Sequence, residues 1–183
     1  MSQWPKNFQL LKYAIFPRLA FLAFVAGIPI AANARDMMPL SVIDLNDRRI
    51  DLPTGLPNGR TMILLAFKHD DQPVLQRWKQ ILKLSPETPG WIEIPAIGVS
   101  IGFVQSMIKS RMKSKNPGAS ARSHIAPAFG DSTRIASAFG VGGDRIELLV
   151  VDHAGHILAG QSGSPDAAKV DQLKSVWHTE TRH

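Results

Sequence analysis

The chain has 183 residues, of which 44% are hydrophobic and 20% charged, and its formal net charge at pH 7 is +6. Such a length and composition are typical of one globular domain that buries a core without disulfides or a structural metal. The sequence contains no cysteine, which excludes catalytic thiols, thiolate-bound zinc, disulfide scaffolds and lipid-anchored lipoproteins.

The first 34 residues have the pattern of a secretory signal peptide. Lys6, Lys12 and Arg18 form a positive leading region, residues 19–30 carry no charge, and Ala32-Asn33-Ala34 is a motif that signal peptidases accept. An uncleaved membrane anchor is the alternative, but the uncharged run is short against the roughly 20 residues of a spanning helix. We therefore expect a signal peptide at residues 1–34 and one exported domain, periplasmic or secreted, at residues 35–183, with no integral membrane segment after cleavage.

Removal of this leader changes the charge of the chain, because the leader holds three basic residues and no acidic one. The remaining 18 Lys and Arg stand against 15 Asp and Glu, which leaves a net charge of +3. A charge this mild does not indicate a nucleic-acid partner.

From residue 37 onward, strand-like and helix-like patterns alternate, which is typical of an α/β fold. Short strands are predicted at residues 41–45 and 50–52, followed by a loop rich in Pro and Gly at residues 53–60. The uninterrupted apolar run at residues 61–67 predicts a central strand that is covered on both faces. Residues 73–84 then carry apolar side chains along one helical side.

The second half of the chain continues this alternation. A strand is predicted at residues 91–97, and an amphipathic helix at residues 101–113, which ends where residues 115–122 break the pattern. Four residues share the apolar side of this helix: Ile101, Val104, Ile108 and Met112. The remaining predictions are a short strand at 124–129, a helix at 132–139, a hairpin of strands 146–151 and 156–159, and a final helix at 166–177.

This order of elements, together with the hairpin sequence VVDHAGHILAGQSG at residues 150–163, resembles the thioredoxin-like superfamily, especially its peroxiredoxin and exported thiol-reductase branches. The resemblance covers residues 39–177 and implies a central mixed sheet flanked by helices. The spacing of Trp78, Glu93 and Gln161-Ser162-Gly163 also resembles the ATP-synthase assembly factor family, which is itself thioredoxin-like.

The chain departs from that superfamily at both halves of its redox site. The resemblance implies a reactive cysteine after the central strand, but residues 68–73 read Lys-His-Asp-Asp-Gln-Pro. It also implies a cis proline before the hairpin, where residues 142–145 read Gly-Gly-Asp-Arg. Thiol oxidoreductase and peroxidase activities therefore do not carry over to this chain, and no cofactor is expected.

The turn after the central strand still carries candidate chemistry, because open α/β sheets bind ligands at the carboxyl ends of their strands. His69 beside Asp70 and Asp71 could act as a general base or as part of a metal site. Capping of the following helix, however, is enough to explain an acid at this position. Glu93 lies within an apolar strand run and is either a buried carboxylate, hence a site candidate, or part of an exposed edge.

Three further residues of the hairpin region are weaker candidates. Glu147 also lies within an apolar strand run, and Arg145 is close enough in sequence to pair with it. His153 and His156 flank the turn glycine of the hairpin, but two histidines without a third donor favour solvated turn residues over a metal site. We therefore predict no metal site.

The densest basic run of the chain consists of Lys109, Arg111, Lys113 and Lys115, with Arg122 beyond it. Such a helix could make a weak contact with an anionic lipid surface or bind an acidic partner. The alternative is that these residues form only a solvated helix face.

Taken together, these features favour an exported, non-redox, thioredoxin-like module that binds an envelope protein, as an assembly or folding helper. Four polar residues would form its binding surface: Lys68, His69, Asp144 and Arg145. The alternative function is an enzyme that does not use a thiol. Its chemistry would be carried by His69, Asp70 and Glu93.

Cleavage of the leader makes a direct prediction for the mature protein. Mass spectrometry of the chain recovered from an envelope fraction should find Arg35 as the amino-terminal residue, because Ala32-Asn33-Ala34 precedes it. An intact Met1 or Ser2 in that fraction would instead support a retained anchor.

Overall fold

The computed structural model describes residues 35–57 and 59–179, and the expected signal peptide at residues 1–34 lies outside this part. The strands are β1 (Arg35–Asp36), β2 (Leu40–Ile43), β3 (Arg49–Leu52), β4 (Arg60–Ala66), β5 (Trp91–Ile97), β6 (Ala128–Phe129), β7 (Glu147–Asp152) and β8 (His156–Ser162). The helices are the 3₁₀ turn η1 (His69–Asp71), α1 (Gln72–Leu82), α2 (Gly102–Lys115), α3 (Ala119–Ser123), α4 (Ser132–Ala138) and α5 (Ala167–Trp177).

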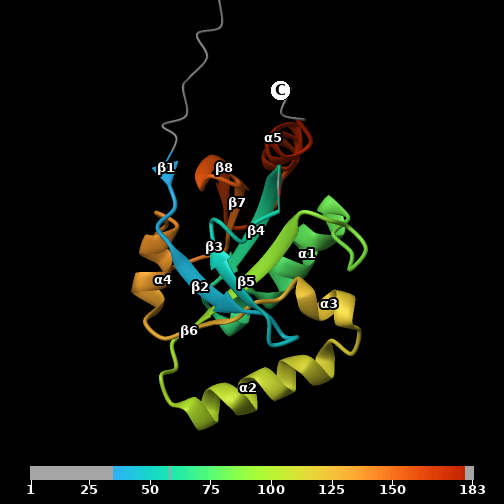
Figure 1. The fold of residues 1–183 in the computed structure, drawn as a ribbon. Helices are drawn as coiled ribbons and strands as arrows, with labels where there is room; N and C mark the ends of the chain where they lie inside the picture. The colour runs from blue at the N-terminus through green and yellow to red at the C-terminus, as the bar shows by residue number, and fades with distance from the viewer. Residues whose placement is uncertain (1–34, 58, 180–183) are drawn as a thin grey trace, which may run out of the picture. The chain divides into compact units, whose positions relative to one another are not determined.

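A mixed six-stranded sheet forms the centre of this domain (Figure 1), in the order β1-β8-β7-β4-β5-β6. The central strand β4 pairs with β5 in parallel and with β7 in antiparallel orientation. The remaining two strands, β2 and β3, form a separate antiparallel ribbon. The carboxyl ends of β4 and β5 therefore lie at the same edge of the sheet, where the parallel connections place the turns that follow each strand.

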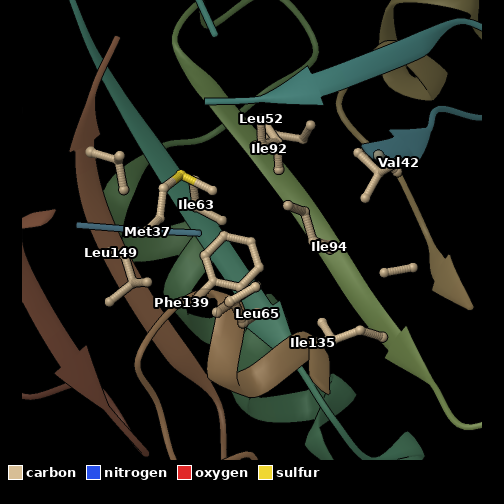
Figure 2. Close-up of a cluster of buried hydrophobic side chains, with 14 of the residues drawn as sticks. Met37, Val42, Leu52, Ile63, Leu65, Ile92, Ile94, Ile135, Phe139 and Leu149 are labelled. Carbon is tan, nitrogen blue, oxygen red and sulfur yellow. The ribbon is translucent and has the colours of Figure 1, made fainter. Parts of the chain in front are cut away.

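Two hydrophobic clusters cover the two faces of the sheet. On one face, Met62 and Leu64 of β4 pack with residues of α1 and α5. On the other face, Ile63 and Leu65 pack with the β2–β3 ribbon and with α4, as Figure 2 shows for Val42, Leu52, Ile135 and Phe139. Because successive side chains of a strand point to opposite faces, the apolar run of β4 supplies both clusters.

The structure confirms most of the predicted elements, with ends shifted by a few residues. The strand at residues 91–97 is found with the predicted bounds, and the hairpin before the last helix is formed by β7 and β8. Two differences occur in one segment. The predicted break at residues 115–122 contains the short helix α3, and the predicted strand at 124–129 shortens to β6 plus a single bridge between Ile125 and Glu93. Pro127, which has no N–H to donate, interrupts that strand.

Helix α1 is fixed to the sheet by its apolar side. Leu75, Trp78 and Leu82 recur at helical spacing and are buried. The indole Nε1–H of Trp78 also donates to the carbonyl of Gly163, at 2.8 Å. This bond satisfies the polar group of a fully buried ring. It also ties the middle of α1 to Gly163, directly after β8.

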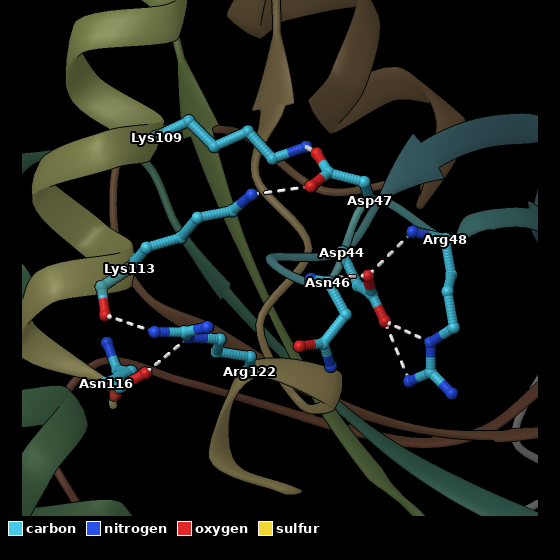
Figure 3. Close-up of polar contacts among 8 residues, drawn as sticks. All are labelled: Asp44, Asn46, Asp47, Arg48, Lys109, Lys113, Asn116 and Arg122. Atoms are coloured by element: carbon cyan, nitrogen blue, oxygen red, sulfur yellow. Dashed lines mark hydrogen bonds and ion pairs between the residues drawn. The ribbon is translucent and has the colours of Figure 1, made fainter. Parts of the chain in front are cut away.

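The turn between β2 and β3 is organised by a buried aspartate. Asp44 is fully buried, and its Oδ1 accepts hydrogen bonds from the backbone N–H groups of Asn46 at 2.8 Å and Arg48 at 2.9 Å. Its Oδ2 forms an ion pair with the Arg48 guanidinium at 2.7 Å (Figure 3). Every oxygen of this carboxylate is therefore satisfied, as a buried charge requires.

Helix α2 is attached to the domain differently from α1, because none of its residues is buried. Its polar attachment runs through Asp47, whose carboxylate binds Lys109 at 2.9 Å and Lys113 at 2.5 Å (Figure 3). The hydrogen bonds and charges of Lys113 and Lys109 lower the pKa of Asp47 to about 2.

Among the described residues, no helix combines the length and the apolar character that crossing a membrane would require.

The role of Asp44 predicts a loss of stability on substitution. Asp44→Ala would remove the acceptor for two backbone N–H groups and the partner of Arg48, so the free energy of unfolding should fall by about 1–3 kcal/mol in a denaturant titration. Asp51→Ala is the control, because Asp51 pairs with Arg49 at the surface of the same ribbon, where ion pairs contribute little. Equal losses for the two variants would contradict the structural role of Asp44.

Candidate functional site

The turn after β4 is closed by Asp71. Its carboxylate Oδ2 accepts a hydrogen bond from the backbone N–H of Lys68 at 3.0 Å, at the start of the helical segment. The side chains of His69 and Asp70 are 94% and 103% exposed, and their nearest charged atoms are 4.0 Å apart. Capping therefore accounts for Asp71, while His69 and Asp70 project into solvent without forming an enclosed acid–base pair.

The loop at residues 142–145 lies beside this turn. Gly143 has a φ of +74°, and a Cβ at this position would lie 2.9 Å from the Cβ of Ala136 and 3.7 Å from the ring of Phe67. Only glycine allows this backbone conformation and this close approach without strain. Because Phe67 directly precedes Lys68, the contact brings together the two segments that the sequence predicted to border one binding surface.

The electrostatics of the site agree with this arrangement. Asp144 and Arg145 form an ion pair at 2.8 Å, with both side chains more than half exposed. The hydrogen bond from Arg145 lowers the pKa of Asp144, and the positive charge of Lys68 lowers it further. Arg145 therefore pairs with Asp144. The predicted ion pair between Arg145 and Glu147 is not found among the described residues. Burial raises the pKa of the half-buried Glu147 carboxyl, and the charge of Arg145 opposes this.

Glu93 is buried, so the interpretation of this residue as part of an exposed strand edge is wrong. Its side chain is 6% exposed and its Oε2 lies 2.9 Å from the Nζ of Lys79 on α1. A buried carboxylate that is neutralised by a partner is a structural ion pair. The three residues of the enzyme hypothesis do not form one site. Glu93 is buried and forms an ion pair with Lys79, whereas His69 and Asp70 are exposed.

The two hairpin histidines have different surroundings. The Nδ1 of His156 lies 2.8 Å from Asp152 and its Nε2 lies 3.8 Å from Asp36. The hydrogen bond with Asp152 raises the pKa of His156. His153 is exposed at the turn. Within residues 35–57 and 59–179, no group of three or more side chains is arranged to hold a metal ion.

The basic run on α2 divides into two sets. Lys109 and Lys113 bind Asp47 and so attach the helix to the domain. Arg111 and Lys115 are exposed. Arg122 donates from Nε to the carbonyl of Asn116 at 2.7 Å and helps to close the end of the helix (Figure 3). The alternative of a solvated helix face therefore holds for Arg111 and Lys115 but not for Lys109 and Lys113.

Sequence reasoning missed two features that arise from tertiary contacts. A cavity of about 570 Å³ lies between β2, the first half of α2 and the segment from Pro127 to Ile135, at a distance in the sequence from the predicted binding residues. The rings of Trp91 and His124 are stacked with centroids 4.3 Å apart, and both nitrogens of His124 lie near carbonyl oxygens, of Trp91 at 2.8 Å and of Pro86 at 3.0 Å. No periodicity in the sequence indicates either feature.

Comparison with known proteins identifies the fold. No protein-family model matches the chain, and no curated protein matches its sequence. Among solved structures, the exposed lipoprotein thioredoxin of Streptococcus pneumoniae aligns with a TM-score of 0.52 at 9% identity, covering 75% of this chain and 98% of its own. A candidate thioredoxin from Neisseria meningitidis aligns with a TM-score of 0.53 at 16% identity, covering 81% and 94%.

A third similar structure, the mitochondrial 2-Cys peroxiredoxin of Plasmodium falciparum, aligns with a TM-score of 0.50 at 10% identity and covers 79% of this chain and 94% of its own. At these identities the likeness establishes the fold and not the activity. The predicted fold class is therefore confirmed: the chain has a thioredoxin-like fold, and it has it without any cysteine.

Proposed function

We propose that this chain is an exported, non-redox module that binds an extended segment of an envelope protein, as an assembly or folding helper. The segment would lie between the turn at residues 68–72 and the loop at residues 142–145. The observation that supports this proposal is the close approach of Gly143 to the Phe67 ring, from which a Cβ at position 143 would lie 3.7 Å away. Export is supported by the sequence pattern of residues 1–34.

The exposed groups at these two loops suit the recognition of a peptide. Lys68, His69, Asp144 and Arg145 are all exposed, so they can donate hydrogen bonds to, or accept them from, a partner backbone. Arg145 is the best suited of the four, because its planar guanidinium carries five N–H donors. Its Nε and Nη2 already donate to Asp144, and the other edge of the guanidinium is left for a carbonyl or carboxylate of the partner. The ion pair with Asp144 restricts the Arg145 side chain, which reduces the entropy lost on binding.

A second, weaker interaction follows from the basic run on α2. The sequence predicted contact with an anionic surface through Lys109, Arg111, Lys113 and Lys115. Because Lys109 and Lys113 are bound to Asp47, such a contact would fall to Arg111 and Lys115.

The peptide-binding proposal predicts that Arg145→Ala and His69→Ala each weaken capture of the partner from an envelope fraction. Interface free energy is concentrated in a few residues, so the affinity should fall by at least about fivefold. The melting temperature should change little, because both side chains are exposed. Binding to the immobilised full chain, with the captured protein identified by mass spectrometry and titrated afterwards, measures the effect.

Arg49→Ala is a matched control for Arg145→Ala. Arg49 is also an exposed arginine paired with an exposed aspartate, Asp51, at 2.7 Å, but it lies on the β2–β3 ribbon. Its removal changes the net charge equally and should leave capture intact. If Arg49→Ala and Arg145→Ala weaken capture to the same extent, the effect is one of general charge and the proposed surface is wrong.

A further inference from the structure

Helix α2 has apolar side chains on two opposite sides. Three residues lie half-buried on the side that faces the domain: Val104, Ile108 and Met112. On the other side, Phe103 is 79% exposed and Met107 is 56% exposed. The sequence predicted Ile101 on the side of Val104, Ile108 and Met112, but this residue precedes the helix in extended conformation and is 67% exposed, so the prediction is wrong for Ile101. The domain itself covers only the first of these two sides. An exposed phenylalanine, methionine and isoleucine lie together at the start of this helix. Their clustering indicates that a partner molecule or surface outside the domain covers the exposed side.

The rotation of α2 about its axis is fixed by its attachments. Lys109 and Lys113 are one turn apart and both reach Asp47, as Figure 3 shows. Gln105, one turn before Lys109, donates to the carbonyl of Val99 at 2.9 Å. Since these three residues share one side of the helix, Phe103 and Met107 are held pointing away from it. Their exposure is therefore built into the attachment of the helix.

Helix α2 and its flanking loops carry no acidic residue of their own, because residues 94–130 contain no Asp or Glu. Arg111 and Lys115 follow Met107 along the helix, are exposed, and take part in no ion pair among the described residues. In Figure 1, α2 runs along the outer margin of the domain.

We propose that the exposed surface of α2, formed by Phe103, Met107 and Arg111 together with Ile101 before the helix and Lys115 at its end, docks on an anionic lipid bilayer. The apolar side chains would insert among the headgroups, and the two basic side chains would bind lipid phosphates. Three apolar side chains on one convex helix are too few for a stable protein interface, which buries about 800 Å² on each partner. They do suit reversible binding to a fluid surface that also supplies negative charge.

This docking is independent of the peptide-binding proposal, because it uses a different surface and a different ligand. Peripheral binding of this kind needs no membrane-spanning segment. Its function would be to hold the domain at the membrane with the surface around Lys68 and Arg145 free for an envelope protein.

The absence of cysteine makes a site-specific test possible. Ser110→Cys in the full chain places one thiol on the outer side of α2, where an environment-sensitive fluorophore can be attached. Vesicles of phosphatidylcholine with about one-third phosphatidylglycerol should shift its emission to the blue and raise its intensity, because the label enters an apolar layer. Vesicles of phosphatidylcholine alone should give little change, and high salt should reverse the shift by screening the charges.

The same label at Ala168→Cys, an exposed position on α5, is the matched control. If the leader tethers the chain to vesicles, both labels approach the lipid equally, so only a difference between the two positions reports docking through α2. Phe103→Ser combined with Met107→Ser should abolish the shift at position 110. Arg111→Gln combined with Lys115→Gln should weaken it several-fold, whereas Arg77→Gln with Lys83→Gln, which removes the same charge from the region of α1, should not.

Three results would overturn the proposal. The first is no response of the label at position 110 to anionic vesicles, and the second is a response no larger than that of the label at position 168. A blue shift that grows with protein concentration in the absence of vesicles would instead assign the covering surface to a second copy of the chain. Circular dichroism of each variant verifies that α2 is retained, which is expected because all the substituted side chains are exposed.

Discussion

The turn from Asp44 to Arg48 is the constraint on which the outer elements of this domain depend. Its buried carboxylate, on Asp44, is satisfied entirely within the turn, so the turn keeps one conformation. From it, Asp47 binds α2, the Asn46 amide donates to the carbonyl of Ala119 at the start of α3, and the Leu45 N–H donates to the carbonyl of Ile125. One short turn thus attaches two helices and the segment before β6, and it fixes which side of α2 faces outward.

This chain has a thioredoxin-like fold without any cysteine, because the packing of the fold does not require a cysteine. The core is held by the two-sided burial of β4 and by the bond from Trp78 to Gly163. The resemblance to the superfamily implies a thiolate at the start of the helical segment. In this chain a carboxylate, that of Asp71, carries a negative charge there and closes the turn by accepting a hydrogen bond from the backbone of Lys68. Gly143 approaches the Phe67 ring so closely that a Cβ at position 143 would lie 3.7 Å from it, so the turn after β4 and the loop at residues 142–145 lie side by side.

Local periodicity was sufficient to predict the elements whose side chains alternate or repeat regularly, such as β5 and α1, and the β7–β8 hairpin with its turn glycine. It was not sufficient for contacts between distant parts of the chain. The binding of Lys109 and Lys113 to Asp47 and the burial of Glu93 against Lys79 depend on tertiary packing. Phe103 and Met107, which form the apolar outer side of α2, can be read in the sequence. The helical spacing of Val104, Ile108 and Met112, however, indicates only the side that faces the domain.

The central claim, that a cysteine-free thioredoxin-like domain binds a protein segment across two neighbouring loops, is tested most directly by hydrogen exchange of the complex. Backbone amides of residues 67–72 and 142–146 should exchange more slowly when the captured partner is bound, since an extended segment between the loops shields both. Protection confined to α2, or to the residues that line the cavity beside β2, with these two segments unchanged, would contradict the account.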